Sequence, residues 1–132
     1  MNGDASGDGR GDGRGDADHD LTFSGFCPVY HRAIEIIGRR WTGAIVRALL
    51  SGDRRFSRIR STIPGLSDRL LSERLKELEA EGIVARTVQY DTPVRIEYTL
   101  TPKGEALGGV VQAVSAWAEE WLPAYGEERA AG

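Results

Sequence analysis

Arginine, serine, glutamate and lysine recur at helical spacing in residues 67–81, and these side chains can hydrogen-bond to bases and phosphates. At about 100° per residue, Arg69, Ser72, Glu73 and Lys76 share one face of a helix. The opposite face is apolar and consists of Leu71, Leu75 and Leu78, with Leu70 flanking it. We therefore expect the apolar face to pack and the polar face to contact DNA, with Arg69 donating two hydrogen bonds to a guanine. The alternative is a polar face that meets only solvent.

Four further arginines flank this segment. Arg55, Arg58 and Arg60 precede it and Arg95 follows it. Because these positions lie beside the polar face and not on it, we expect contacts to phosphates, which affect salt dependence more than sequence preference. An ordinary surface charge or a local ion pair is the alternative for each. Arg74 falls toward the apolar side of the helix, where we expect it to be a structural partner of a carboxylate.

Cys27 is the only cysteine of the chain and directly precedes Pro28 at the start of a helical pattern, with His31 one turn further along. The positive end of a helix stabilises a thiolate, so a thiol that senses oxidants or electrophiles is one interpretation. A small buried core residue is the other. Without a second cysteine, sensing requires alkylation, a mixed disulfide with a small thiol, or a disulfide between subunits.

A helix-turn-helix and a hairpin are needed to hold the DNA-facing side chains. Residues 55–63 predict a first helix, Pro64-Gly65-Leu66 a tight turn, and residues 67–81 a second helix. Residues 83–90 and 95–100 alternate as two antiparallel strands, and the loop between them is the wing. The order predicts a mainly α fold with a small β-hairpin, which is a winged helix-turn-helix.

Both ends of the second helix carry capping residues. Ser67 is an N-cap residue that also belongs to the expected DNA-contacting set, and Asp68 places a carboxylate in the first turn. Gly82 stands where a left-handed C-terminal cap is expected. The helix boundaries therefore follow from local sequence.

Three more helices are expected around this motif. One begins at Pro28 and ends at Gly38, a second runs from Trp41 to Gly52, and both are expected to belong to the core. A last, continuous helix is expected from Pro102. Its apolar stripe is wider than a small core needs, so we expect part of it to form a dimer interface. The stripe comprises Leu107, Val110, Val111, Val114, Trp117 and Trp121.

Length and composition fit one small domain. The chain has 132 residues, 40% of them hydrophobic, and residues 1–20 hold no large apolar side chain after Met1. We expect a disordered Gly/Asp-rich tail at residues 1–22, a DNA-binding and dimerisation domain at residues 23–125, and a disordered end at residues 126–132. Residues 1–20 carry net −4, whereas residues 39–103 carry 13 basic and eight acidic side chains, net +5. The acidic tail therefore makes the net charge of the whole chain negative, although residues 39–103 form a basic region suited to binding phosphates.

No apolar run is long enough to span a bilayer and no secretion signal opens the chain, so we expect a cytoplasmic protein without a membrane partner. A single cysteine fits a reducing compartment. Neither a metal nor a cofactor is expected. The Asp-rich start with His19 lacks an ordered ligand set, and the glycines at positions 104, 108 and 109 do not follow a strand as a phosphate-binding loop requires.

Taken together, the motifs resemble the HxlR family of bacterial winged-helix transcription regulators, which are MarR-like. The resemblance covers about residues 27–121 and rests on CPV at 27–29, IGRRWT at 37–42, RRFSRIRSTIPGLSDRLLSERLKELEAEGIV at 54–84, TPVRIEYTLTPKG at 92–104 and SAW at 115–117. It implies a homodimer, formed mainly by the terminal helices, that binds a twofold-symmetric operator in the nucleoid. It also implies a sensing cysteine before the first helix, where Cys27 stands.

Three features depart from the family pattern. Arg39-Arg40 replace a glycine-lysine pair and keep positive charge, whereas Pro93-Val94 replace a double proline and are expected to make the wing less rigid. Gly108-Gly109 replace larger apolar residues, which disfavours a helix by about 0.5–1 kcal/mol each relative to alanine.

The leading hypothesis is a sequence-specific DNA-binding transcription regulator, not an enzyme, that responds to an oxidant, an electrophile or a small molecule. Repression is the expected direction because a small dimer can act by occupying a promoter. A winged-helix protein-interaction module is the alternative, and it would show no salt-steep binding to duplex DNA. A thiol enzyme at Cys27 would need a third orienting group, which the sequence does not offer.

Overall fold

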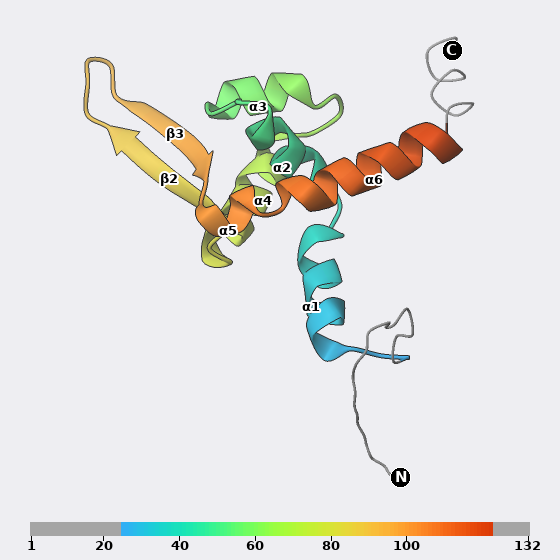
Figure 1. Cartoon of the computed structure of the whole chain (residues 1–132). Helices are drawn as coiled ribbons and strands as arrows, with labels where there is room; N and C mark the ends of the chain where they lie inside the picture. Colours follow the sequence, from blue (N-terminus) through green and yellow to red (C-terminus); the bar gives the residue numbers. More distant parts are fainter. Residues whose placement is uncertain (1–24, 123–132) are drawn as a thin grey trace. The chain divides into compact units, whose positions relative to one another are not determined.

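The computed structural model describes residues 25–122 and agrees with the predicted winged helix-turn-helix (Figure 1). The helices in this range are α1 (Pro28–Ile37), α2 (Thr42–Leu50), α3 (Phe56–Thr62), α4 (Asp68–Ala80), α5 (Pro102–Glu105) and α6 (Gly108–Trp121). The strands β2 (Val84–Gln89) and β3 (Arg95–Leu100) form an antiparallel hairpin. The disordered ends predicted at residues 1–22 and 126–132 lie outside the described residues.

Local sequence sets the ends of α4 as predicted. The Ser67 hydroxyl oxygen accepts the Leu70 N–H at 3.1 Å, which satisfies one of the free amides of the first turn. Gly82 has φ 74°, the left-handed conformation that glycine adopts without strain. The chain can therefore reverse after α4 and enter β2, where Val84 pairs with Leu100.

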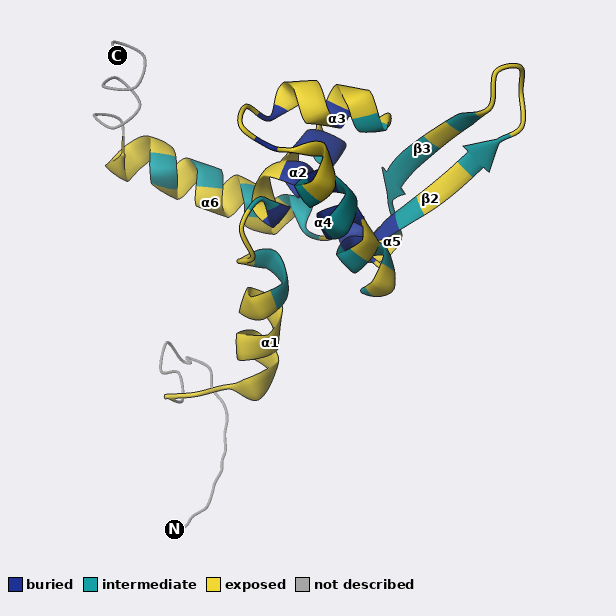
Figure 2. Cartoon of the chain, turned by 180° about the vertical axis from the view of Figure 1, so that it is seen from behind, coloured by how far each residue is buried: buried dark blue, intermediate teal, exposed yellow. Residues whose placement is uncertain are grey.

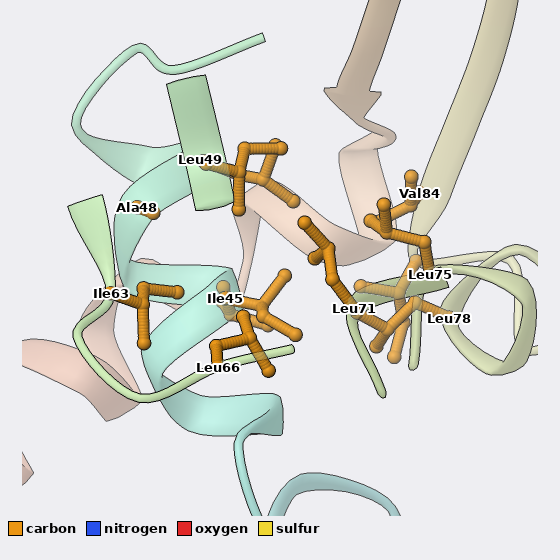
Figure 3. Packing of buried hydrophobic residues seen from close by; sticks show 12 residues of the cluster. Ile45, Ala48, Leu49, Ile63, Leu66, Leu71, Leu75, Leu78 and Val84 are labelled. Carbon is orange, nitrogen blue, oxygen red and sulfur yellow. The ribbon is translucent and has the colours of Figure 1, made fainter. Parts of the chain in front are cut away.

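Aliphatic side chains from α2, α3, α4 and β2 form the core (Figure 3). Ile45 of α2, Ile59 of α3 and Leu71 of α4 are fully buried. The apolar face predicted for residues 67–81 is confirmed, because Leu75 and Leu78 are also buried and pack in the same cluster. Burial of this face holds α4 in place and leaves its other face uncovered.

The expected core position of residues 28–37 is wrong for the single chain. No residue of α1 is buried, and Val29, Tyr30 and Ile34 are all exposed (Figure 2). The periodicity of this segment predicts a helix with an apolar face, but periodicity does not say what covers that face. The same expectation is confirmed for α2, whose Ile45 and Val46 are buried.

The continuous helix expected from Pro102 is also wrong, because the chain breaks between α5 and α6. The Leu107 N–H bonds to the Gly104 C=O at 3.0 Å, a tighter turn than that of an α-helix. Gly108 follows at once, and glycine is a weak helix former. Gly104 packs so closely that a Cβ on it would lie 2.2 Å from the Ile83 carbonyl oxygen. This close contact holds α5 against the start of β2, and the chain turns before α6 begins.

Candidate DNA interface

The polar face of α4 is assembled as the sequence predicts. The Arg69 side chain is 88% exposed, and its Nε lies 3.2 Å from Glu73 Oε2. Lys76 is exposed on the same face, and Ser72 is half-buried beside it. The Ser67 hydroxyl accepts the capping hydrogen bond and keeps its own O–H to donate. These groups offer several donors and one carboxylate acceptor to a groove.

Three of the four flanking arginines already hold a carboxylate in the free protein. The pairs are Arg58 Nε with Asp53 Oδ1 at 3.5 Å, Arg60 Nε with Asp68 Oδ1 at 2.7 Å, and Arg95 Nη2 with Asp91 Oδ2 at 3.0 Å. Arg55 is exposed and forms no ion pair with any residue in the described range. Surface pairs of this kind contribute about 0–1 kcal/mol, so a phosphate can replace the carboxylate at little cost.

Arg74 has the structural role that the sequence predicts. Its side chain is only 9% exposed. The Nε donates to the Arg40 carbonyl oxygen at 2.9 Å, and Nη1 lies 3.3 Å from Glu77 Oε2. Arg74 therefore ties α4 to the segment before α2, and its Nη1 also lies 3.9 Å from Oε1 of Glu73 on the DNA-facing side.

Arg86 on β2 is a basic residue beside α4 that the sequence reasoning missed. It is exposed, has no ion-pair partner among residues 25–122, and lines a groove together with Ser72, Lys76 and Tyr98. Strand alternation could have found it, since Arg86 and the buried Val84 are two residues apart and share one face of the hairpin. That face is turned toward α4, which brings Arg86 close to Lys76.

Cys27 is exposed and stands just before the first residue of α1. Its carbonyl oxygen accepts the His31 N–H at 2.9 Å, and the His31 ring lies 5.3 Å from the Phe26 ring between centroids. The alternative of a buried core cysteine is therefore wrong for the single chain. An exposed thiol at a helix start can react with a diffusing oxidant.

The apolar stripe of α6 divides into two parts. Leu107 and Val111 pack against the core, beside α2. The outer part remains uncovered and comprises Val110, Val114, Trp117 and Trp121, which are 42%, 61%, 58% and 65% exposed. These four positions repeat at helical spacing and so share one face.

Within residues 25–122, no three His, Cys, Asp or Glu side chains gather as a metal site requires. No helix in that part of the chain has the length and apolar character needed to cross a membrane.

Comparison with known proteins gives one consistent family. A model described as HxlR-like helix-turn-helix matches residues 36–125. The chain is 52% identical over 99 residues to the uncharacterized HTH-type transcriptional regulator YvaP of Bacillus subtilis. The aligned segment covers 75% of this chain and 92% of YvaP. It is 47% identical over 95 residues to the HTH-type transcriptional regulator YodB of the same organism. That aligned segment covers 72% of this chain and 85% of YodB.

Solved structures of relatives have the same fold. The reduced form of YodB matches with a TM-score of 0.66 at 46% identity, over 74% of this chain and 95% of that one. The diamide-treated form of YodB matches with a TM-score of 0.63 at 46% identity, over 74% of this chain and 97% of that one. The quinone-bound form matches with a TM-score of 0.62 at 45% identity, over 73% of this chain and 100% of that one. The redox regulator HypR in its oxidised form matches with a TM-score of 0.66 at 36% identity, over 71% of this chain and 96% of that one.

The family match spans most of the described chain, and the fold, the exposed polar face of α4 and the hairpin beside it agree with that match. The relatives that it resembles are transcription regulators and not enzymes. This chain therefore belongs to the HxlR-like family of DNA-binding helix-turn-helix transcription regulators.

Proposed function

We propose that this regulator binds a twofold-symmetric operator as a homodimer, represses transcription by occupying the promoter, and responds to oxidants or electrophiles at Cys27. The observation that carries the proposal is the two-sided character of α4. Arg69 is almost wholly exposed, while Leu71 and Leu75 on the opposite side are buried. A helix held by one face can enter a major groove with the other.

In the groove, Arg69 exchanges Glu73 for a guanine and donates two hydrogen bonds to its O6 and N7. Ser72 and Glu73 reach bases or phosphate. Lys76 contacts the phosphate backbone of the DNA. Arg86 contacts it too, because Arg86 and Lys76 line the same groove on the protein surface beside α4. Recognition of sequence therefore depends on α4, and affinity on the cations around it.

Phosphate contacts from α3 and the wing fix the position of α4 on the duplex. Arg55, Arg58 and Arg60 supply them from α3, and Arg95 supplies one from the hairpin. The ion pairs that three of these side chains form in the free protein break as the phosphates bind. Each exchange adds to the salt dependence of binding.

The homodimer is supported by the outer part of the α6 stripe. Val110, Val114, Trp117 and Trp121 leave a continuous apolar face in contact with water, which a second copy of the helix removes. A twofold dimer presents two copies of α4, so the operator has two related half-sites.

Control through Cys27 is supported by its exposure, by its position before α1, and by relatives solved in diamide-treated, quinone-bound and oxidised forms. With a quinone, the thiolate sulfur bonds to a ring carbon, the electron pair moves to the quinone oxygen, and that oxygen takes up a proton. With diamide, two Cys27 thiols from different subunits lose two hydrogens to the azo bond, which becomes a hydrazine as the disulfide forms. A mixed disulfide with a small thiol is the remaining oxidised product.

The test is fluorescence anisotropy of the full-length protein titrated onto duplex DNA from the region upstream of its own gene, with a scrambled duplex as the reference. Binding is measured in reduced protein and after diamide or a quinone. We expect tight binding to the upstream duplex, steep salt dependence, and a change in Kd on treatment that Cys27→Ser abolishes. The Val29→Ala variant is the matched control, because it changes an exposed position of α1 but keeps both the thiol and His31.

Each part of the proposal would be refuted by a different experimental result. Selective binding that oxidants leave unchanged would refute Cys27 control and favour a small-molecule effector. Equal binding to both duplexes would refute an operator at this site, and salt-insensitive or absent binding would favour a protein-interaction module.

A further inference from the structure

A row of ion pairs runs from the turn before α2 to the DNA-facing face of α4. Its members alternate in charge and are Arg39, Glu77, Arg74, Glu73 and Arg69. Arg39 Nε lies 3.3 Å from Glu77 Oε1, and Arg74 Nη1 lies 3.3 Å from Glu77 Oε2. The same Nη1 lies 3.9 Å from Glu73 Oε1, and Arg69 Nε lies 3.2 Å from Glu73 Oε2. The exposed Arg69 is therefore linked to a residue outside α4.

Arg74 is the buried member of this row. Its side chain is 9% exposed, whereas those of the other members are between 40% and 88% exposed. The Arg74 Nε donates to the Arg40 carbonyl oxygen at 2.9 Å, which holds the guanidinium against the backbone. A buried charge must be paired, and the carboxylates of Glu73 and Glu77 lie beside this one. Arg74 therefore places a fixed positive charge behind Glu73.

We infer that Arg74 is a positioning residue for operator recognition, because it keeps the Glu73 carboxylate when Arg69 leaves that carboxylate for a guanine. The two oxygens of Glu73 pair with different arginines, Oε2 with Arg69 and Oε1 with Arg74. Departure of Arg69 frees only Oε2, which can then accept a hydrogen bond from a cytosine amino group. Oε1 stays beside Arg74, so the carboxylate does not meet the phosphates without a counter-charge. The inference rests on the proposed function, in which Arg69 reads a guanine.

Glu77 competes with Glu73 for the same nitrogen of Arg74. Nη1 lies closer to Glu77, at 3.3 Å against 3.9 Å for Glu73. Arg39 attracts Glu77 from the other side, since its Nε is also 3.3 Å away. Loss of the Glu77 charge should therefore leave Arg74 to Glu73, and loss of the Arg39 charge should have the opposite effect.

Anisotropy of full-length variants on the upstream and scrambled duplexes tests this role, with selectivity defined as the ratio of the two Kd values. We expect Arg74→Met to lower the selectivity about 5- to 30-fold, because both half-sites are affected. In protein that already carries Glu73→Gln, the same change should lower it by no more than about twofold. The matched control is Lys103→Met, which also removes a cation bonded to a backbone carbonyl oxygen, that of Glu81, but lies outside the row.

Two results of this experiment would overturn the inference. A merely structural role of Arg74 would lower the selectivity equally with and without the Glu73 carboxylate. Equal weakening of both duplexes by Arg74→Met would show that Arg74 does not act through Arg69, since Arg69 reads bases in the upstream duplex alone.

Two further variants test the row without removing its buried member. Glu77→Gln should raise the selectivity about two- to fivefold and Arg39→Met should lower it by a similar factor, in both cases only while Glu73 is present. Circular dichroism checks the fold of each variant, and this pair decides the result if Arg74→Met does not fold. Changes of the same sign in both variants would overturn the inference.

A measurement without DNA separates this inference from the proposed function. Arg69→Ala reproduces the departure of Arg69 in the free protein, so Arg74 and Glu73 should become more strongly coupled. Urea titrations of Arg74→Met, Glu73→Gln and the double variant measure this coupling with Arg69 present and with Arg69→Ala. We expect its effect on the unfolding constant to be about two- to fivefold larger without Arg69.

The two failures then differ. Coupling that Arg69→Ala leaves unchanged would overturn the inference even if the upstream duplex is bound selectively. Stronger coupling in a protein that does not distinguish the two duplexes would refute the proposed function, and with it the role of Arg74 in recognition.

Discussion

Replacing Arg69 with alanine is expected to remove base recognition by α4 while leaving the fold intact. The side chain is 88% exposed, and its ion pair with Glu73, at 3.2 Å, joins positions four apart on a helix surface. Such pairs contribute about 0.3–0.5 kcal/mol. The free energy of unfolding should therefore fall by no more than about 0.5 kcal/mol.

The effect on operator binding should be much larger. One bidentate arginine–guanine contact contributes about 1–3 kcal/mol of discrimination, and a dimer presents Arg69 to both half-sites. The Arg69→Ala variant should therefore lose about 2–6 kcal/mol of operator binding, which is a rise in Kd of at least about 30-fold. Glu73 would then keep only the longer ion pair with Arg74, at 3.9 Å among the described residues, so its charge adds repulsion from the DNA and shifts the result toward the upper value.

Anisotropy at one fixed salt concentration, on operator and scrambled duplexes, measures this loss. Lys76→Ala is the control, because a phosphate contact should weaken both duplexes alike and lower the salt slope by about 0.9 per contact. Equal weakening of both duplexes by Arg69→Ala would place Arg69 on a phosphate. Unchanged affinity for both would refute α4 as the recognition helix.

Three other changes follow from the structure. Ser67→Ala removes the cap on the Leu70 N–H and should lower the free energy of unfolding by about 1 kcal/mol in urea titrations; an unchanged midpoint would mean that water replaces the hydroxyl. Gly104→Ala places a methyl 2.2 Å from the Ile83 carbonyl oxygen and should cost about 1–3 kcal/mol in the same assay; a neutral result would mean that α5 can move away from β2. Trp117→Ser removes an exposed apolar group from α6, so sedimentation should show a weaker dimer and circular dichroism an unchanged fold; an unchanged dimer would place the interface elsewhere.

The helix-turn-helix could be predicted from sequence because its determinants are local. Ser67 and Gly82 act within one turn of the ends of α4, and the spacing of Leu71, Leu75 and Leu78 decides which face is buried. The outward position of Arg69 follows from the same periodicity. The position of Arg74 toward the apolar side follows from the same periodicity, and from there it reaches the Arg40 carbonyl oxygen.

Other features depend on contacts between distant parts of the chain, and local pattern does not contain them. The break between α5 and α6 accompanies the contact of Gly104 with Ile83, a residue before β2, so helical periodicity alone predicted one continuous helix. The position of Arg86 beside Lys76 requires the hairpin to fold against α4.

Local sequence accounts for the helices and strands between residues 55 and 100, for the ends of α4 and for the side chains that face outward from it, because these depend on interactions within a few residues. Tertiary packing accounts for the arginines that hold carboxylates, for the position of Arg86 beside Lys76, and for the uncovered outer stripe of α6. Those features depend on which surfaces meet when the elements pack. The packing follows from the burial of apolar area across the whole chain, and no short window of sequence records it.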